Sequence, residues 1–536
     1  MKKGWLFLVG CLILSLLQSC VSKNVDVIDN FDDEEPVEFI EKKSPGGNYG
    51  VFYQIFVGSF ASGSNNGKGD LRGIIQRMDY LNNGNIASNR SLNVDGIWLT
   101  PVHPSRSYHK YDVMDFMAID RSFGTMADFE ELISECKKRG IKVIIDLVIN
   151  HTSSEHPWFL TARRGDQKYM AYYNLSNTRL SDKYHPLGFG GMFYEAEFWH
   201  QMPDLNLDNP EVREEIKSII NFWIEKGVAG FRLDAVSKYH TDNHPKNIEF
   251  LKWFTEYCKS VKNDVYVVAE AWESAGIVMN YYDSQIPSMF NFAMSDEKGI
   301  LPIAVATRNG ANLTTAMVNW NKAIKEKNPG GIDAVFISNH DQNRSAGYFN
   351  QDPVKIKMAA ALYLTMPGNP FIYYGEEIGM TGSGVDPNKR SPMVWSVNNS
   401  AGIPGRPPGM TQRFRPNAGV AEQLRNPNSI ARFYIEAVRL RNRYPVLFYG
   451  EPEELKTGDR AIASWTISAG EIKVAVVHNL SAAEKKLIID GVQVLGGTLT
   501  ADSTGGVPSF DRTTLTLPPF STALLELNEL IFEDLE

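Results

Sequence analysis

Acidic and histidine side chains gather at the ends of four short segments of high β-propensity. These segments are residues 146–151, 230–234, 269–272 and 338–341. Arg232 and Asp234 are two positions apart on a β-type run, so their side chains point the same way and the guanidinium would keep Asp234 ionised. Glu270, crowded by other carboxyl groups and flanked by Trp272, would have a raised pKa and keep its proton. An ionised and a protonated carboxyl group in one site predict a nucleophile beside a general acid.

Eight short runs rich in β-forming residues must position these groups. The runs are residues 51–57, 96–100, 141–148, 230–234, 265–270, 289–293, 334–339 and 370–374. They alternate with helical patterns, one of which starts with a capping pair, Thr125 and Asp128. The alternation predicts an α/β fold, a (β/α)8 TIM barrel built from residues 48–150 and 206–445. In such a barrel the active site lies at the C-terminal ends of the strands, where the four acidic segments fall.

Two regions depart from this alternation. Residues 151–205, between the third and fourth β-runs, are rich in Gly, Tyr and Asp and predict a small inserted subdomain. Pro445 ends the last helical pattern, and residues 446–536 contain runs typical of antiparallel strands. We expect this C-terminal part to form an antiparallel β-sandwich. Shielding of the barrel is its favoured role, and ligand binding is the alternative.

The N-terminal residues predict export and a lipid anchor. Lys2 and Lys3 precede an apolar stretch too short to span a bilayer permanently, so residues 1–19 are expected to be a cleaved signal peptide. Residues 17–20 resemble the bacterial lipobox, in which the cysteine, here Cys20, is acylated; an ordinary signal peptide with a chance Cys is the alternative. Residues 20–47, with this cysteine first, form an acidic, flexible linker. The expected location is a bacterial membrane in the cell envelope, the outer-membrane surface being one option.

Composition and charge argue against one class of partner. The chain has 536 residues, 43% of them hydrophobic, and a formal net charge of -9 without a long basic run, which argues against a nucleic-acid partner.

Cys136 and Cys258 each lie on an apolar helical stripe, so they are expected to be buried free thiols. We expect a monomer.

The acidic segments, with residues 108–112 and 202–206, resemble the signature regions of the alpha-amylase superfamily, glycoside hydrolase family 13. The resemblance covers almost the whole mature chain. It implies that Asp234 is the nucleophile, Glu270 the general acid/base and Asp341 the third carboxylate of a retaining glycosidase. For retention the carboxyl groups of nucleophile and acid should be about 5 to 5.5 Å apart.

The same resemblance implies a set of groups that bind the sugar at the cleavage point. They are Arg232, His151, His340, His109, Tyr111, Asp112 and Arg390. The three histidines would donate to sugar hydroxyls, and Tyr111 would stack on the sugar face. Asp112 and Arg390 would bind its non-reducing side, although an Asp–Arg pair at the base of a loop is often purely structural.

Calcium is the one metal that the family suggests, and no organic cofactor is expected. Relatives often bind it in an acidic loop after the first strand, but residues 62–70 carry Ser or Asn where carboxylates are usual. Asn66 and Asp70 remain as candidate ligands, and calcium prefers several charged oxygens, so a weakened or empty site is expected. A second family site would use Asn150 and Asp204. In the segment after Asp234, however, this chain has Lys238, and a lysine at that place disfavours calcium binding.

These patterns lead to one main functional hypothesis, hydrolysis of α-1,4-glucosidic bonds in starch and malto-oligosaccharides. Residues 202–206 resemble a group intermediate between alpha-amylases and oligo-1,6-glucosidases, which leaves endo against exo action and tolerance of α-1,6 bonds open. The alternatives are a neopullulanase or α-glucosidase, a transglycosylase or sugar isomerase on the same scaffold, and a non-catalytic glucan-binding lipoprotein. The presence of all three carboxylates argues against the last.

Overall fold

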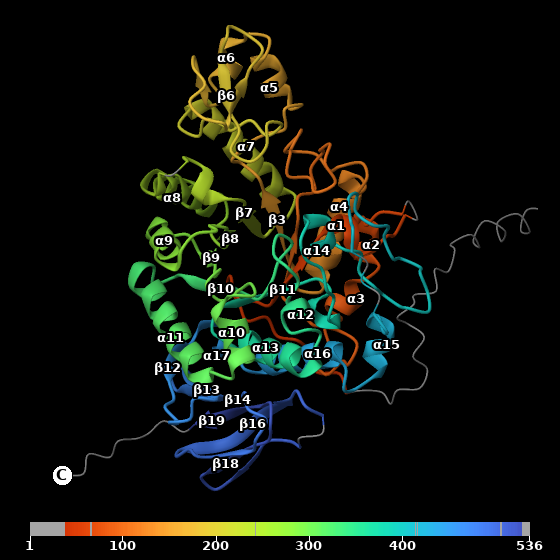
Figure 1. The fold of residues 1–536 in the computed structure, drawn as a ribbon, viewed down its shortest axis with the longest axis vertical. Coiled ribbons are helices and arrows are strands. Elements are labelled where there is room, and N and C mark those ends of the chain that lie inside the picture. Colours follow the sequence, from red (N-terminus) through yellow and green to blue (C-terminus); the bar gives the residue numbers. More distant parts are fainter. Residues whose placement is uncertain are drawn as a thin grey trace, which may run out of the picture. The chain divides into compact units, whose positions relative to one another are not determined.

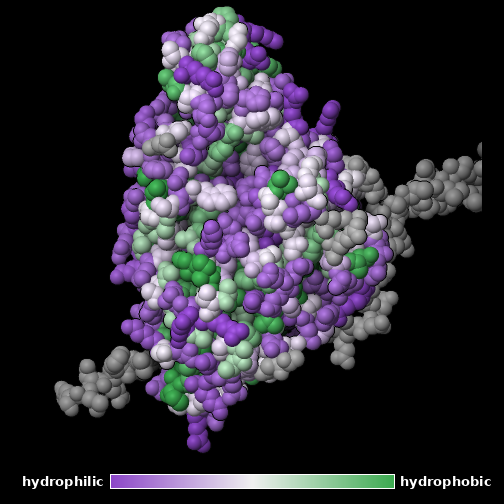
Figure 2. All heavy atoms as spheres, in the orientation of Figure 1, coloured by the Kyte–Doolittle hydropathy of each residue, from purple (hydrophilic) through white to green (hydrophobic). Residues whose placement is uncertain are grey.

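The computed structural model describes residues 38–64, 67–241, 243–412, 414, 416–503 and 506–527. The predicted signal peptide, the lipidation candidate Cys20 and the candidate calcium ligand Asn66 lie outside these residues. Across the described part of the chain, no helix combines the length and the apolar character that crossing a membrane requires. On the face drawn in Figure 2, hydrophobic residues form separate small groups within a mainly hydrophilic surface.

Eight parallel strands close into a barrel in the order β1-β11-β10-β9-β8-β7-β3-β2 (Figure 1), which confirms the predicted fold. The strands are β1 (Phe52–Ile55), β2 (Gly96–Leu99), β3 (Lys142–Leu147), β7 (Gly230–Leu233), β8 (Tyr266–Ala269), β9 (Ser288–Phe290), β10 (Ile332–Phe336) and β11 (Asn369–Tyr373). Their inward side chains fill the barrel with an apolar core that includes Phe52, Trp98 and Tyr266. A filled barrel leaves substrate access only at its ends.

Helices surround the strands and connect them. They are α1 (Val57–Phe60), α2 (Leu71–Ile75), α3 (Met78–Leu81), α4 (Met126–Lys138), α7 (Pro210–Glu225), α8 (His244–Val261), α9 (Ala275–Tyr281), α10 (Ile300–Thr307), α11 (Gly310–Lys327), α12 (Ser345–Tyr348), α13 (Pro353–Thr365), α14 (Asp386–Lys389), α15 (Val420–Arg425), α16 (Ile430–Arg443) and α17 (Val446–Tyr449). Helix α4 starts as predicted, because Thr125 and Asp128 form a reciprocal capping box. Cys136 and Cys258 are buried free thiols, as expected.

A small subdomain lies between β3 and β7. It contains α5 (Pro157–Ala162), α6 (Gln167–Met170) and a three-stranded antiparallel sheet of β4 (Leu175–Ser176), β5 (Tyr184–Pro186) and β6 (Phe193–Glu195). His151 and Asp204 form an antiparallel bridge, so the two ends of the insertion meet beside the end of β3. This places insertion residues next to the acidic segments of the barrel.

The C-terminal part forms two antiparallel sheets. One has the order β12-β13-β14-β19-β16 and the other β15-β18-β17. The strands are β12 (Glu451–Glu454), β13 (Ile462–Ala469), β14 (Ile472–Asn479), β15 (Lys485–Ile488), β16 (Val492–Thr500), β17 (Ser509–Asp511), β18 (Thr514–Leu517) and β19 (Ser521–Leu527). Apolar side chains of both sheets, such as Val477 and Leu515, share one core. Thr314 of α11 accepts a hydrogen bond from the backbone of Ser464, which joins this part to the barrel.

Candidate active site

The three acidic residues predicted to do chemistry line a single pocket of about 390 Å³. Asp234 directly follows β7, Glu270 directly follows β8, and Asp341 lies on the segment after β10. All three therefore sit at the C-terminal edge of the barrel. The complete lining is His109, Tyr111, His151, Phe198, Met202, Asp234, Ala235, Glu270, Trp272, Asp341, Asp386 and Arg390.

Backbone hydrogen bonds tie the ends of β7 and β8 together. The N–H of Glu270 donates to the carbonyl of Leu233 at 2.9 Å, and the N–H of Val236 donates to the carbonyl of Glu270 at 2.8 Å. Between these contacts Ala235 adopts a φ of 45°, a left-handed conformation that non-glycine residues rarely take. The strained turn keeps Asp234 and Glu270 at neighbouring places on the pocket wall.

Arg232, fully buried, provides positive charge beneath the pocket. Its Nη1 donates to Oδ1 of Asp234 at 2.6 Å and to Oδ1 of Asp146 at 2.6 Å. Its Nη2 forms an ion pair with Oε2 of Glu270. The contact with Asp234 is the one that the two-residue spacing predicts. Because the guanidinium also contacts Glu270, Arg232 alone does not distinguish the ionised carboxyl group from the protonated one.

Asp146 is a buried carboxyl group behind the pocket. Burial raises its pKa to about 7, against the lowering effect of Arg232. It accepts hydrogen bonds from the indole of Trp98 at 3.2 Å and from the hydroxyl of Tyr111 at 2.9 Å. Asp146 therefore orients Tyr111 and shares Arg232 with the two carboxylates of the pocket.

His340 occupies a different place from the one predicted. It is fully buried and lies against Tyr111, with the rings nearly parallel and their centroids 5.5 Å apart. Burial lowers its pKa to about 3, so the ring is neutral, and the amide of Gln54 donates to Nδ1 at 2.8 Å. The proton is therefore on Nε2, which lies 2.5 Å from Oη of Tyr111 and 3.1 Å from Oδ2 of Asp341. His340 supports these two groups instead of facing a sugar hydroxyl.

The other two histidines do line the pocket. His109 accepts a hydrogen bond from the N–H of Tyr111 at Nδ1, which leaves Nε2 as the donor of the neutral ring. Burial and the charge of Arg390 lower the pKa of His109 to about 4. In His151, Nδ1 lies 3.3 Å from the amide of Asn150 and Nε2 lies 3.2 Å from the carbonyl of Tyr111. His109 is thus the better placed of the two to donate to a sugar.

Asp112 is not in the pocket, contrary to the expectation from sequence. Its carboxylate accepts hydrogen bonds from the hydroxyls of Ser105 and Ser107 and from the N–H of Arg106. These donors occupy both oxygens and make Asp112 the centre of a tight turn. These contacts support the structural alternative for Asp112, and the ion pairs of Arg390 are with Asp341 and Asp386.

Arg390 pairs with Asp341 instead. Its Nη2 donates to Oδ1 of Asp341 at 2.7 Å and lies 3.4 Å from Oδ2 of Asp386, while Nη1 donates to the hydroxyl of Tyr108 at 2.9 Å. Burial would raise the pKa of Asp341, but His340 and Arg390 outweigh it and lower this pKa to about 2. Asp341 therefore stays ionised at neutral pH.

The described part of the loop after β1 does not fit a calcium ion. Asp70 accepts at Oδ1 from the N–H groups of Gly63 and Gly73, and at Oδ2 from the N–H and hydroxyl of Ser64. Protein donors thus occupy the lone pairs that a calcium ligand must offer. Among the described residues, no group of three or more His, Cys, Asp or Glu could hold a metal ion.

The second family site has the same difficulty. Oδ1 of Asp204 accepts from the amide of Asn150 at 3.1 Å, and Oδ2 accepts from the N–H of Glu197 at 2.9 Å. Burial raises the pKa of Asp204 well above its ordinary value. The ammonium of Lys238 lies 4.0 Å from Glu197, which brings a positive charge to this region. Protein donors thus again occupy carboxylate oxygens that a calcium ligand must offer.

The pocket wall also contains residues that were not among the predicted site residues, namely Phe198, Met202, Ala235, Trp272 and Asp386. Phe198, 49% exposed, comes from the inserted subdomain, and its ring lies 5.6 Å from that of His151. Asp386 begins α14 and faces Arg390, and its four-residue spacing from Arg390 was the signal that could have revealed it. Trp272, named only for its effect on Glu270, is 51% exposed and stacks on Phe292. Trp272 and Phe198 give the pocket exposed aromatic surface.

A closed (β/α)8 barrel with three carboxylates at its C-terminal edge is the architecture expected of a retaining glycoside hydrolase. The family model described as "Alpha amylase, catalytic domain" matches residues 54–450. The chain therefore belongs to the alpha-amylase family.

Three relatives show the range of activities named among similar proteins. Alpha-amylase 3 of Dictyoglomus thermophilum is 40% identical over 81% of this chain and 85% of its own length. Oligo-1,6-glucosidase of Parageobacillus thermoglucosidasius is 31% identical over 80% and 90%, respectively. The 4-alpha-glucanotransferase of Thermotoga maritima is 32% identical over 83% and 98%. Among solved structures, Amy13B of Eubacterium rectale has a TM-score of 0.86 at 36% identity and covers 91% of this chain and 97% of its own.

Proposed function

We propose that this enzyme is a retaining alpha-amylase that cleaves α-1,4-glucosidic bonds in starch and malto-oligosaccharides. The observation that carries this proposal is the meeting of Asp234, Glu270 and Asp341 in one pocket. Alpha-amylase 3, at 40% identity, supports the choice of substrate.

The proposed reaction has two steps. In the first, the Asp234 carboxylate attacks the anomeric carbon and forms a glycosyl ester, while Glu270 gives its proton to the departing glucosidic oxygen. In the second, Glu270 takes a proton from water, the water oxygen attacks the same carbon, and the ester bond to Asp234 breaks. Two inversions leave the α configuration unchanged. Arg232, which contacts both carboxyl groups, holds them in place through both steps.

Asp341 stabilises the positive charge that develops on the sugar. Its lowered pKa keeps it ionised, and Arg390 and His340 fix its orientation. A carboxylate that is already oriented needs no reorganisation as the oxocarbenium-like charge appears. Tyr111, whose hydroxyl is held by Asp146 and His340, stacks one face of its ring on the sugar in this proposal.

The exposed aromatic groups belong on the leaving-group side of the cleaved bond. Trp272 is two residues from Glu270, the group that protonates the leaving oxygen, and Phe198 lines the same pocket. Aromatic faces bind sugar rings through stacking and apolar contact. The same surface would also bind an acceptor sugar, so transglycosylation, the activity in the name of the Thermotoga maritima relative, is the second candidate function.

Product analysis on amylose, pullulan and maltotetraose tests these functions, with Asp234→Asn as the inactive control. Early mixed oligosaccharides from amylose support endo-acting hydrolysis, and glucose alone would replace the proposal with an exo-acting glucosidase. Panose from pullulan would indicate a neopullulanase. Products longer than maltotetraose would indicate transfer, and absence of turnover by the wild type would refute an enzymatic function.

We further propose that the enzyme is exported, anchored through acylated Cys20 and monomeric. The charged residues and apolar stretch before Cys20, and the lipobox-like residues 17–20, support the anchor. Labelling with a radioactive fatty acid in a bacterial host should mark the wild type and leave Cys20→Ala unlabelled. Equal labelling of both proteins would refute the anchor. Light scattering of the purified protein without its lipid anchor tests whether it is a monomer.

We propose that calcium contributes little to this enzyme, since the carboxylates of Asp70 and Asp204 already accept hydrogen bonds from protein donors. Addition of a calcium chelator should therefore change the melting temperature by less than about 2 °C. Removal of a tightly bound ion would instead cost several kcal/mol of stability and lower the melting temperature further. A larger drop that calcium reverses would contradict this.

A further inference from the structure

Arg344 is a buried arginine that joins two segments bordering the active site. It lies three residues after Asp341, and 1% of its surface is exposed. Its Nε donates to the carbonyl of Lys389 at 2.8 Å, and its Nη1 donates to the carbonyl of Tyr374 at 2.7 Å. Lys389 ends α14 and Tyr374 follows β11. One guanidinium therefore links these two segments to the strand end that carries Asp341.

The residue held by Arg344 immediately precedes Arg390, which in turn holds Asp341. Arg390 donates from Nη2 to the carboxylate of Asp341 and, at 3.0 Å, from Nε to the carbonyl of His340. The ammonium of Lys389 donates to the carbonyl of Asp341 at 2.8 Å. Residues 389–390 thus hold both the side chain and the backbone of Asp341, and Arg344 fixes the backbone of these residues.

The surroundings of Arg344 leave it little freedom to move. Its guanidinium carbon lies 4.3 Å from the ring centroid of Tyr373 and 4.7 Å from that of Tyr374, within the range of cation–π attraction. Gly375 has a φ of 81°, and a Cβ at this position would lie 3.3 Å from Nη1 of Arg344. The hydroxyl of Tyr373 donates a second hydrogen bond to the carbonyl of Lys389, at 3.0 Å.

We propose that Arg344 is a positioning residue for catalysis, which sets Arg390 against Asp341 by holding the carbonyl of Lys389. Because Arg344 is buried, it acts through Arg390 and does not touch the sugar. This inference rests on the proposed glycosidase function, in which Asp341 contacts the reacting sugar.

The test starts with Arg344→Met, which removes both donors and keeps much of the side-chain volume. We expect kcat/KM for maltotetraose, expressed per active site, to fall by about 10-fold or more, mainly through kcat, since small misplacements of positioned groups have effects of this order. A purely structural role would lower the melting temperature and the fraction of active enzyme, and it would leave kcat/KM per active site unchanged. An unchanged kcat/KM per active site would therefore overturn the proposal.

A double-mutant cycle with Arg390→Ala tests the route of the effect. If Arg344 acts through Arg390, the double variant should have a kcat/KM within about 2-fold of that of Arg390→Ala alone, because the two losses are not independent. Losses in kcat/KM that multiply would show independent actions and overturn the proposal. A wild type without turnover would instead contradict the proposed function, so the two failures are distinguishable.

Two milder variants and one control guard against a folding defect. Arg344→Lys should recover part of the lost kcat/KM, and Tyr373→Phe, which removes the other donor to Lys389, should lower kcat/KM per active site by about 2- to 3-fold. If Arg344→Met does not fold, these two variants decide the question, and a kcat/KM per active site unchanged in both refutes the proposal. Arg441 is the matched control, since it is also fully buried and donates to the carbonyls of Leu364 and Met366. Arg441→Met should lower the melting temperature without changing kcat/KM per active site.

Discussion

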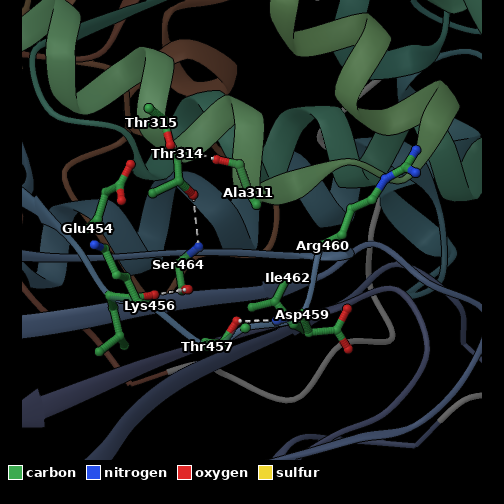
Figure 3. Close-up of a pocket in the computed structure, with 12 residues that line it drawn as sticks. Ala311, Thr314, Thr315, Glu454, Lys456, Thr457, Asp459, Arg460, Ile462 and Ser464 are labelled. Atoms are coloured by element: carbon green, nitrogen blue, oxygen red, sulfur yellow. Dashed lines mark hydrogen bonds between the residues drawn. The ribbon is translucent and has the colours of Figure 1, made fainter.

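Two pockets of nearly equal size differ in how their charged groups are held. The active-site pocket has about 390 Å³, and a pocket between α11 and the strands β12 and β13 has about 400 Å³ (Figure 3). In the first, the guanidinium of the buried Arg390 is fixed by bonds to Asp341 and Tyr108. In the second, Lys456 and Arg460 are exposed, and the hydrogen bonds drawn in Figure 3 join uncharged groups, such as the backbone N–H of Ser464 and the hydroxyl of Thr314.

The comparison teaches that volume does not mark a catalytic site. A catalytic site is marked by charged side chains that buried partners hold in place, because such groups are oriented before the substrate arrives and their pKa values are shifted. Exposed charges on long side chains are screened by water and change rotamer freely. Four substitutions can break or sharpen this contrast.

The largest effect is expected from Asp234→Asn. Loss of the nucleophile should reduce kcat by about 10⁴-fold or more, as for other residues that form the covalent intermediate. Initial rates of reducing-end release from maltotetraose, with circular dichroism to verify folding, measure this loss. A reduction of less than 100-fold would mean that another group is the nucleophile.

The next effect is expected from Asp341→Asn, which should lower kcat by about 10²- to 10³-fold through loss of a preorganised charge. Asp459→Asn is the matched control, because Asp459 is an acid of the second pocket and should leave kcat unchanged. Similar losses in both variants would remove the contrast between the pockets.

Asp341 also predicts a pH dependence of stability. Its folded-state pKa, about 2, is below the value of about 3.9 expected for an unfolded Asp. The ionised side chain therefore stabilises the fold above pH 4, and this contribution of about 2 kcal/mol is lost as the pH falls from 4 to 2. Denaturant unfolding of Asp341→Asn should show a correspondingly smaller loss of stability over this range, and an identical loss would contradict the assignment.

A smaller effect is expected from Trp272→Ala. Removing this exposed ring should raise the KM for malto-oligosaccharides about 5- to 10-fold with little change in kcat, since aromatic contacts contribute about 1 kcal/mol. Trp199 offers the control, because it is also an exposed tryptophan, 41% accessible, but does not line the pocket. Equal changes in KM for Trp199→Ala would show that exposure alone, not position, accounts for the effect.

The smallest effect is expected from Arg460→Ala in the second pocket. With an exposed side chain on the surface, this substitution should change kcat/KM by less than about 2-fold and stability by less than about 0.5 kcal/mol. Kinetics on amylose and on maltotetraose measure it. A loss seen with amylose alone would show that the second pocket binds the polymer, so that exposed charges there also serve function.

Sequence patterns predicted the barrel because local features carry most of its information. Strands β7 and β8 fall within the predicted runs, since apolar residues and a following carboxylate mark both of them. Strand β10 begins at Ile332, two residues before the predicted start at 334. The reason is Asp333, a buried acid that interrupts the apolar pattern and accepts hydrogen bonds from Asn291 and Trp320.

The sequence by itself determined the order of the strands, the three acidic residues at their ends and the pairing of Arg232 with Asp234. These features depend on residue type and on spacings of a few positions, which the period of a strand converts directly into geometry. Only the tertiary structure decided that His340 contacts the hydroxyl of Tyr111, that Asp112 closes a turn, and that Arg390 holds Asp341. Such contacts join residues far apart in the chain, and neither residue alone shows which partner the packing will supply.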